Sequence, residues 1–394
     1  MVSLTDAISS APAYLRHGLP CDPYSRFPPS QVFDVSISPF WTIGSIAHGG
    51  YLLALLTRTS IEHQRLSSSP HLDPAHLSSE FLTASVPGKA QVEVRVLSRA
   101  KRWTRLDVEL WQYDCPGPDT GDYLHAERVL RVRAHYLFTD LPSPPNPSSL
   151  PSASSTSATP ASSDDGGLTF LDRPCPLLQH PGEVDMSKGG TKIPDKFGFK
   201  DGMRWAEVET KGDSDEGVLK WGCWFELTGG EDLTESAALV PFFADCSKNG
   251  PEVLPAELRP GPSWYPTLTF SLDFKSKFPL VPASPSDPSS SSSSSVPQIA
   301  RRTFGLFATT KTIQAGRHDL TVEVWTAPCE LGDKATVGEG WRAKARLVGV
   351  STQMAITVPI EFNHARGRRS LTGDSSSSGS ESEGEGSGNG KARL

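Results

Sequence analysis

The chain has 394 residues, enough for two domains of ordinary size. Its net charge of -7 argues against a nucleic-acid partner, and no apolar stretch is long enough to predict a membrane span. Six scattered cysteines without a Cys-x-x-Cys pair favour reduced thiols, so we expect neither a disulfide framework nor a bound metal, and no cofactor. The N-terminal segment has neither the basic start nor the apolar block of a secretory signal.

The first predicted helix follows two glycines. The stretch GSIAHGGYLLALLTRTS at 44–60 places His48, Gly49 and Gly50 before an apolar run that is typical of a buried helix, Tyr51 to Ile61. Free N–H groups at a helix start can hold a carbonyl oxygen or an anion, so these three residues form a candidate binding site. The alternatives are a tight turn that leads into a core helix, and a histidine packed beneath the helix start.

The two halves of the chain repeat one order of motifs. An acid-Phe pair precedes a proline both in SSEFLTASVPGK at 78–89 and in FSLDFKSKFPLV at 270–281, and Val-Glu-x-Trp recurs at 108–111 and 322–325. Alternating apolar positions in both halves predict antiparallel strands. A second apolar helix is expected in TESAALVPFFADC at 234–246, with Thr234 as its cap. The repeat predicts an α+β fold in which one helix is wrapped by antiparallel strands, twice.

Three low-complexity stretches separate and end these halves. Each lacks the apolar side chains that would offset the entropy of ordering, so we expect disorder there. The predicted organisation is an N-terminal unit at 1–140, a Ser/Pro-rich linker at 141–167, a C-terminal unit at 168–362 with a Ser-rich insert at 281–297, and an acidic tail at 363–394.

Four motifs carry a resemblance to a known family. HGGYLLALL, PTLTFSLDF, GRHDLTVEVW and VGVSTQMAI, in this order and within a duplicated chain, resemble the thioesterase-like superfamily related to acyl-CoA thioesterase II. The resemblance implies a double hotdog, in which two antiparallel sheets each wrap a central helix and form one extended sheet. It also implies that an acyl-CoA or another acyl thioester is the substrate, and leaves the oligomeric state open.

The same resemblance implies a catalytic set in the second half. In acyl-CoA thioesterase II enzymes an Asp, a Thr or Ser, and a Gln hold and activate water. By motif these fall on Asp273 of SLDF, Thr310 of ATTKT with Thr312 close behind, and Gln353 of STQMAI. A carboxylate can take a proton from water, while an amide and a hydroxyl fix its place. The alternatives are a solvated Asp273 paired with Lys275 and a Gln353 that is a satisfied core amide.

Other sequence features leave further interpretations open. Glu80, the first-half counterpart of Asp273, is either a second acid or a relic of duplication. The basic run at 95–105 either binds coenzyme A phosphates or is a solvated strand face. A Gly-x-Ser-x-Gly motif is absent, so an α/β-hydrolase has no support. The alternative to a thioesterase is a non-catalytic acyl-binding hotdog; a hotdog hydratase is weaker, because no Asp and His have a suggestive spacing.

The last three residues resemble a targeting signal. Ala392, Arg393 and Leu394 are similar to peroxisomal addresses of the Ser-Lys-Leu type, with Ala in place of Ser. We therefore expect a peroxisomal import receptor as a partner. The competing account is a cytoplasmic protein whose chain ends this way by chance.

Overall fold

The computed structural model describes residues 3–9, 15–17, 30–114, 127–142, 173–186, 197–210, 217–280, 299–334 and 340–363. The Ser-rich insert, the tail from 364 onward and all but the first two residues of the predicted linker lie outside this set. The predicted targeting signal lies outside it as well, so these four expectations stay predictions.

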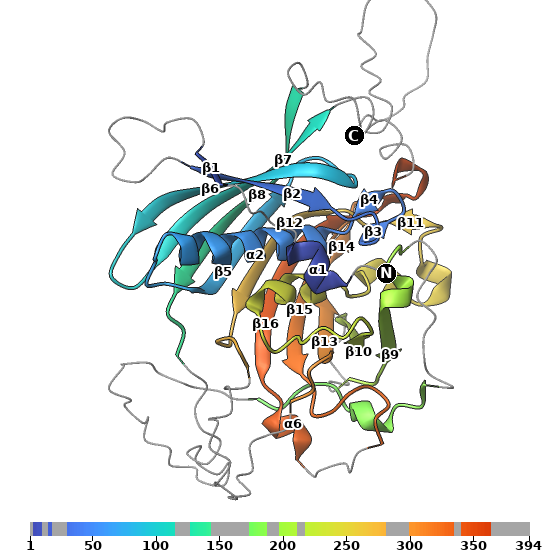
Figure 1. The fold of residues 1–394 in the computed structure, drawn as a ribbon. Helices are drawn as coiled ribbons and strands as arrows, with labels where there is room; N and C mark the ends of the chain where they lie inside the picture. The colour runs from blue at the N-terminus through green and yellow to red at the C-terminus, as the bar shows by residue number, and fades with distance from the viewer. Residues whose placement is uncertain are drawn as a thin grey trace, which may run out of the picture.

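One antiparallel sheet of 13 strands runs through the molecule (Figure 1). Its first-half strands are β1 (Leu15–His17), β2 (Gln31–Ile37), β5 (Asp73–Phe81), β6 (Gly88–Arg99), β7 (Thr104–Asp114) and β8 (Glu127–Thr139). Its second-half strands are β9 (Met203–Glu207), β10 (Leu219–Leu227), β12 (Thr267–Phe274), β13 (Thr303–Thr310), β14 (Ile313–Gln314), β15 (Arg317–Thr326) and β16 (Leu347–Ile356). Two small pairs complete the strands, β3 (Thr42–Ile43) with β4 (Ile46–Ala47) and β11 (Ser263–Trp264) with β17 (Val358–Pro359).

The two halves of the sheet have the same strand order. The first half reads β2-β6-β7-β8-β5, and the second reads β10-β13-β15-β16-β12. They join where β5 pairs with β12, with Ser79 opposite Phe270. The predicted double hotdog is therefore confirmed, and the repeat read from the motifs is a repeat of topology.

Each half places helical residues against the sheet, but in unequal amounts. In the first half α2 (Gly49–Leu66) crosses the strands as one long buried helix (Figure 1). In the second half a single 3₁₀ turn, η4 (Ala237–Leu239), leads into the short α4 (Val240–Ala244), followed by α5 (Gly250–Val253). The shorter elements elsewhere are α1 (Leu4–Ser9), α6 (Trp341–Lys344), η2 (Pro181–Glu183), η3 (Lys200–Gly202) and η5 (Ala256–Leu258). Helix α2 packs on α4, and one hydrophobic core spans both halves.

The predicted cap of the second helix is wrong by two residues. Ser236 is the N-cap, and its side chain accepts a hydrogen bond from the Ala238 N–H. Thr234 instead donates its hydroxyl proton to Asp232, because the chain turns once more before the helix begins. Serine and threonine are both good N-cap residues, so residue type alone does not decide between them.

The repeated Val-Glu-x-Trp motif builds the same local structure twice. The strand pairing slips just before Trp111 in β7 and just before Trp325 in β15. In both places the indole N–H donates to the glutamate two residues earlier, at 3.2 Å to Glu109 and 3.0 Å to Glu323. A β-bulge bends a strand and increases its twist, so the motif marks one curve in each half of the sheet.

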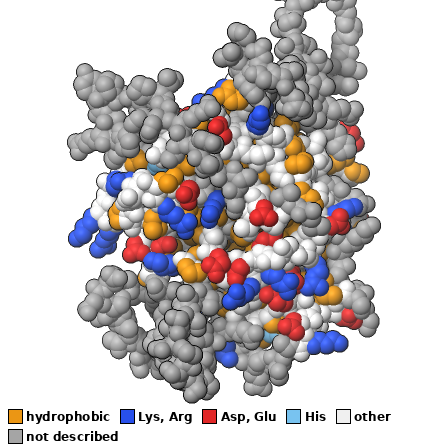
Figure 2. Space-filling view, in the orientation of Figure 1, with side chains coloured by type: hydrophobic (Ala, Val, Ile, Leu, Met, Phe, Trp, Pro, Cys, Tyr) orange, Lys and Arg blue, Asp and Glu red, His pale blue; other side chains and the backbone are white. Residues whose placement is uncertain are grey.

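The surface carries both signs of charge. On the face in Figure 2, acidic and basic side chains lie interspersed among polar and apolar ones. Within the described ranges, no helix has the length and apolarity that crossing a bilayer requires. The same part of the chain holds no cluster of three or more His, Cys, Asp or Glu side chains placed to hold a metal ion.

Candidate active site

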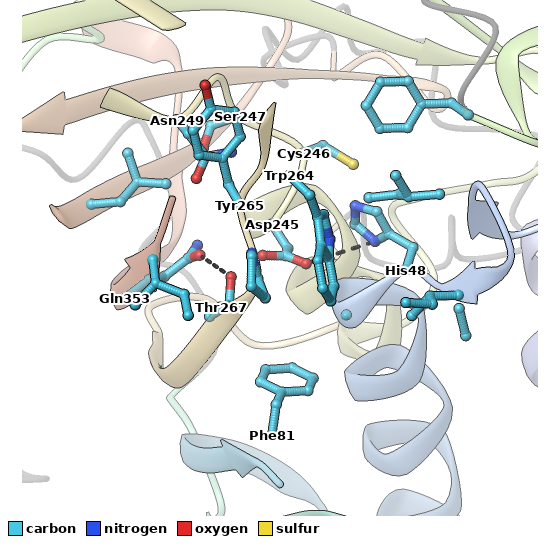
Figure 3. Close-up of a pocket in the computed structure, with 18 of the residues that line it drawn as sticks. His48, Phe81, Asp245, Cys246, Ser247, Asn249, Trp264, Tyr265, Thr267 and Gln353 are labelled. Carbon is cyan, nitrogen blue, oxygen red and sulfur yellow. Dashed lines mark hydrogen bonds and ion pairs between the residues drawn. The ribbon is translucent and has the colours of Figure 1, made fainter. Parts of the chain in front are cut away.

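A cavity of about 480 Å³ opens where the two halves meet. The start of α2, the end of α4 and the ends of β12 and β16 each contribute residues to its wall. Aromatic side chains make up much of the rest, namely Phe81, Phe197, Phe199, Trp205, Phe225, Trp264, Tyr265 and Phe362. Among these walls the carboxylate of Asp245 lies between His48 and Thr267, with Gln353 beyond (Figure 3).

Asp245 is the buried acid of this cavity. It is the C-cap of α4, and its Oδ2 accepts a 2.6 Å hydrogen bond from the backbone N–H of Gly50 at the start of α2. Burial raises the pKa of the Asp245 carboxyl to about 7, although hydrogen bonds from Gly50 and Thr267 act to lower it. A carboxyl that titrates near neutrality can both take up and release a proton in its working range.

Thr267 and Gln353 complete a polar group beside this acid. The Thr267 hydroxyl has two acceptors beside it, Gln353 Oε1 at 3.4 Å and the Asp245 carboxylate, and its single proton serves one of them at a time. The Gln353 amide is fixed because its Nε2 donates to the Ala244 carbonyl at 2.8 Å. That carbonyl belongs to the residue before Asp245, so β16 holds both the amide and the end of α4.

A β-bulge turns Thr267 toward the cavity. Pairing between β12 and β16 slips between Thr267 and Thr269, which leaves Leu268 as the extra residue. Side chains alternate along a strand, so without the slip Thr267 would share the outer face with Thr269 and Asp273. With the slip it lies opposite the buried Ala355 instead, on the same face as Gln353.

His48 and the first residues of α2 lie at the cavity, and their role in binding substrate stays a prediction. His48 and Gly49 line it, and Gly50 contacts Asp245 directly. A side chain at either glycine would collide with Asp245, since a Cβ would lie 2.9 Å from its Oδ2 at Gly49 and 2.7 Å from its Cβ at Gly50. The pair of glycines therefore allows the helix start to approach the acid.

His48 is the N-cap of α2 and is neutral at physiological pH. Its Nδ1 accepts from the Tyr51 N–H at 3.4 Å and lies 3.7 Å from Asp245 Oδ2. Burial lowers the pKa of His48 to about 4, with a hydrogen bond to the Asp245 backbone opposing the shift. The contact between His48 and the acid is therefore no ion pair near pH 7.

Asp273 does not join this group. The structure places it on the outer face of the sheet, where its side chain is 51% exposed. There it binds His76 Nδ1 at 2.7 Å and Lys275 Nζ at 3.2 Å. The predicted convergence of Asp273 with Gln353 is wrong, because the two residues lie on opposite faces of the sheet, and the alternative of a solvated acid paired with Lys275 describes its surroundings. Its counterpart Glu80 is likewise exposed.

Thr310 and Thr312 also lie away from the polar group. Thr310 is buried at the end of β13 and donates to the backbone carbonyl of Asp319 at 2.9 Å. Thr312 is exposed, and its N–H donates to the Asp319 carboxylate. Neither lines the cavity. The predicted hydroxyl position is therefore wrong, and Gln353 is the one member of the predicted set at the site.

Two residues of the site were not predicted from the sequence. Asp245 ends the apolar run VPFFADC, and Thr267 opens the strand motif PTLTFSLDF. A lone acid at the end of a buried helix was the available signal for Asp245. None of the residues in the basic run at 95–105 lines the cavity. The run begins on β6 (Gly88–Arg99), which agrees with the interpretation as a strand face.

Comparisons with known proteins relate this chain to thioesterases. Residues 37–135 match the sequence model of the acyl-CoA thioesterase N-terminal domain. The predicted resemblance to thioesterase-like double-hotdog proteins is confirmed. An uncharacterized protein of Mycobacterium tuberculosis is 31% identical over 119 residues, which cover 30% of this chain and 39% of that relative. The match thus spans about two fifths of the relative's length.

The likeness to solved structures covers most of this chain. The acyl-CoA thioesterase II TesB2 from Mycobacterium marinum superposes with a TM-score of 0.51 at 10% identity, over 83% of this chain and 93% of that one. A protein with a hot dog fold from Alicyclobacillus acidocaldarius covers 90% of this chain and 97% of its own, with 13% identity and a TM-score of 0.49. At the identity of TesB2 the likeness shows a shared fold.

Proposed function

We propose that this double hotdog hydrolyses acyl thioesters, and that acyl-CoA is its substrate class. The observation that carries the proposal is the group formed by Asp245, Thr267 and Gln353, which lies against the start of α2 in the wall of one largely apolar cavity. An acid, a hydroxyl and an amide are the side chains that the family resemblance requires for holding water. The sequence match to a thioesterase domain supports the reaction type.

The attacking water is held by the three side chains. Asp245 accepts one of its protons, while Thr267 and Gln353 fix its oxygen toward the thioester carbon. A general base works best when its pKa lies near the operating pH, and the pKa of about 7 at Asp245 meets that condition. A positioned base of this kind contributes about 100- to 10,000-fold to a rate.

The start of α2 supplies the positive end for the developing oxyanion. Gly50 N–H is taken by Asp245, Tyr51 N–H by His48, and Leu52 N–H by the His48 carbonyl. Within the described residues, the Gly49 N–H has no such acceptor, and Gly49 lines the cavity. We assign that N–H to the carbonyl oxygen, where the helix dipole adds to the hydrogen bond.

The reaction balances with these groups alone. The water oxygen bonds to the carbonyl carbon as its proton passes to Asp245, and the negative charge moves to the carbonyl oxygen. When the carbonyl re-forms, the carbon–sulfur bond breaks and the proton on Asp245 passes to the departing thiolate. The products are a carboxylic acid and a free thiol, and Asp245 returns to its carboxylate form.

The walls suit an acyl group, with its carrier outside. Phe199 and Phe225 are buried deep in the wall, while Leu82 and Phe362 are about half exposed. This gradient favours an apolar chain inside and a polar carrier at the rim. An acyl chain would then reach inward from the thioester held at Asp245.

A thiol-release assay tests the proposal. Purified protein is incubated with acyl-CoAs of different chain length, and free thiol is measured with a chromogenic disulfide. We expect release by the wild type, a loss of about 1,000-fold in Asp245→Asn, and an unchanged rate in the matched control Asp273→Asn. Equal rates in both variants would contradict the assignment of Asp245. Tight binding of acyl-CoA without release in the wild type would favour the acyl-binding alternative instead.

A further inference from the structure

The loop that carries Asp245 is fixed at both ends. At its start the C-cap of α4 holds it, since the N–H groups of Asp245 and Cys246 donate to Phe242 and Phe243. It continues for four residues to Asn249, which caps α5. All five of its residues, 245–249, line the cavity, and Figure 3 labels Asp245, Cys246, Ser247 and Asn249 there. What holds the far end therefore bears on where the acid lies.

His318 forms a hydrogen bond with the side chain of Asn249 at the far end of the loop. Its ring is 98% buried on β15, and its Nε2 lies 3.0 Å from Asn249 Oδ1. An amide oxygen only accepts, so His318 is the donor in this contact, while the Asn249 N–H donates to the Glu252 carboxylate at 3.2 Å. Tyr265, another cavity residue, packs its ring edge-on against the imidazole at 5.9 Å.

Thr310 holds the next residue. A Cβ on Gly250 would lie 2.5 Å from Thr310 Cγ2 and 2.7 Å from its Oγ1, so backbone and side chain are in direct contact. The Thr310 hydroxyl is itself tied to the Asp319 carbonyl at 2.9 Å. Asp319 also accepts from the N–H groups of Lys311 and Thr312, which closes the turn beyond β13. The contact surface under Gly250 is therefore rigid.

We propose that His318 and Thr310 are positioning residues that fix the far end of the Asp245 loop and so set the place of the acid against Thr267. This inference rests on the proposed function. It gives Thr310, the hydroxyl that the sequence placed among the catalytic residues, a supporting role one layer further out. Loss of this support leaves the fold intact but lets the loop shift toward solvent, and misplacement of a reacting group by 1 Å can cost about 100-fold in rate.

The first test compares two variants of His318. His318→Phe keeps a ring but removes the donor, whereas His318→Gln keeps an N–H at about the same reach. We expect His318→Phe to lower kcat about 10-fold with KM nearly unchanged, and to shift the acid limb of the pH profile downward, because a more solvated Asp245 loses part of its raised pKa. His318→Gln restores both. His135→Phe, at an exposed histidine of the outer face, is the control and leaves both unchanged.

The second test is a double-mutant cycle. Gly250→Ala pushes the loop against Thr310, and Thr310→Gly removes all three side-chain atoms, Cγ2, Oγ1 and Cβ, that the new methyl group would meet. We expect Gly250→Ala to lose about 100-fold in kcat and the double variant to recover most of it. Additive losses would overturn the contact between loop and threonine as the cause.

A direct titration separates this inference from the proposed function. The carboxyl carbon of Asp245 can be followed by NMR in the wild type and in both His318 variants, without any turnover. If the pKa of the Asp245 carboxyl is near 7, falls in His318→Phe and returns in His318→Gln, then His318 positions the acid. This result would hold even in a protein that releases no thiol. An unchanged pKa in His318→Phe overturns this role, whatever the activity.

Discussion

The two halves of the molecule share one topology but use the same positions differently. Asp245 lies nine residues after Ser236, the N-cap of η4. Thr57 likewise lies nine residues after His48, the N-cap of α2. Gln353 pairs with Leu320 on β15, as Tyr136 pairs with Leu106 on the equivalent strand β7. In the first half Thr57 and Tyr136 join their hydroxyls at 3.0 Å inside the core. In the second half the corresponding acid and amide face a cavity.

Helix length explains the difference. Helix α2 runs for 18 residues and fills the first half with apolar side chains, whereas α4 ends after five residues at Ala244. The chain beyond Asp245 reads Cys-Ser-Lys-Asn-Gly-Pro, and neither glycine nor proline favours a continuing helix. The second half therefore supplies the acid, hydroxyl and amide of the site, whereas the first half contributes the start of α2 and part of the cavity wall.

The largest expected effect concerns the free energy of unfolding and the acid in the open half. Because burial raises the pKa of Asp245 to about 7, the folded state holds a proton that the unfolded state has released, and stability falls as pH rises between about 4 and 7. Asp245→Asn removes this cost. We expect it to stabilise the protein by about 4 kcal/mol at pH 8 and by about half of that at pH 5, as measured by urea unfolding.

Asp273→Asn is the control, and we expect it to change the free energy of unfolding in the opposite direction. Burial acts to raise the pKa of Asp273, but hydrogen bonds and charge from His76 and Lys275 hold it below the usual range. A lowered pKa stabilises the folded state above the unfolded pKa, so this variant should lose stability at pH 8. If Asp245→Asn also destabilised the protein, burial of the Asp245 carboxylate would not cost unfolding free energy, and this interpretation would be contradicted.

The next effect concerns the bulge in β12 that places Thr267 and Thr269 on opposite faces of the sheet. Thr267→Val keeps the shape of the side chain and removes its hydroxyl, whereas Thr269→Val makes the same change two residues along, on the exposed outer face. We expect Thr267→Val to lower kcat by about 10- to 100-fold, the worth of one hydrogen bond to a charged group. Thr269→Val should leave kcat unchanged. Similar losses in the two variants would mean that the bulge does not select the face.

The third effect is the pH dependence of hydrolysis. The carboxylate form of Asp245 is the active base, so kcat/KM should fall about tenfold for each pH unit below about 7. His48 faces the same acid but carries a pKa of about 4, and burial raises the pKa of the neighbouring Cys246 well above its usual range. Neither group should therefore add a limb near neutrality. A rate that stays level down to pH 5 would exclude Asp245 as the base.

Much of the fold followed from the sequence because it depends on patterns that repeat. The acid-Phe and Val-Glu-x-Trp motifs mark equivalent strands, and the apolar run after His48 becomes α2. The site followed less well because motif resemblance placed the acid and the hydroxyl on Asp273 and Thr310, and the bulge that turns Thr267 inward was not foreseen. One extra residue reverses the face of everything before it, and nothing local in PTLTFSLDF announces it.

Asp245 was missed for a different reason. Its place depends on where α4 stops and on the approach of Gly50 from a helix 195 residues earlier in the chain. Such a contact has no local pattern, although the glycines that permit it were visible. Gln353 was found through the motif STQMAI, and the alternation of buried and exposed residues along β16 (Leu347–Ile356) keeps its side chain on the inner face.

The smallest expected effect tests the closed half. Tyr136→Phe removes the hydroxyl that bonds to Thr57, and it leaves the ring in the core. The Thr57 hydroxyl keeps its bond to the Leu53 carbonyl at 2.7 Å, so no buried donor is orphaned. The loss of unfolding free energy should therefore be about 1 kcal/mol, the net worth of one ordinary hydrogen bond. Thiol release should stay at the wild-type rate, measured in the same preparation. A large loss of activity would mean that the first half takes part in catalysis beyond the start of α2, and that the equivalent positions of the two halves have not diverged into core and site.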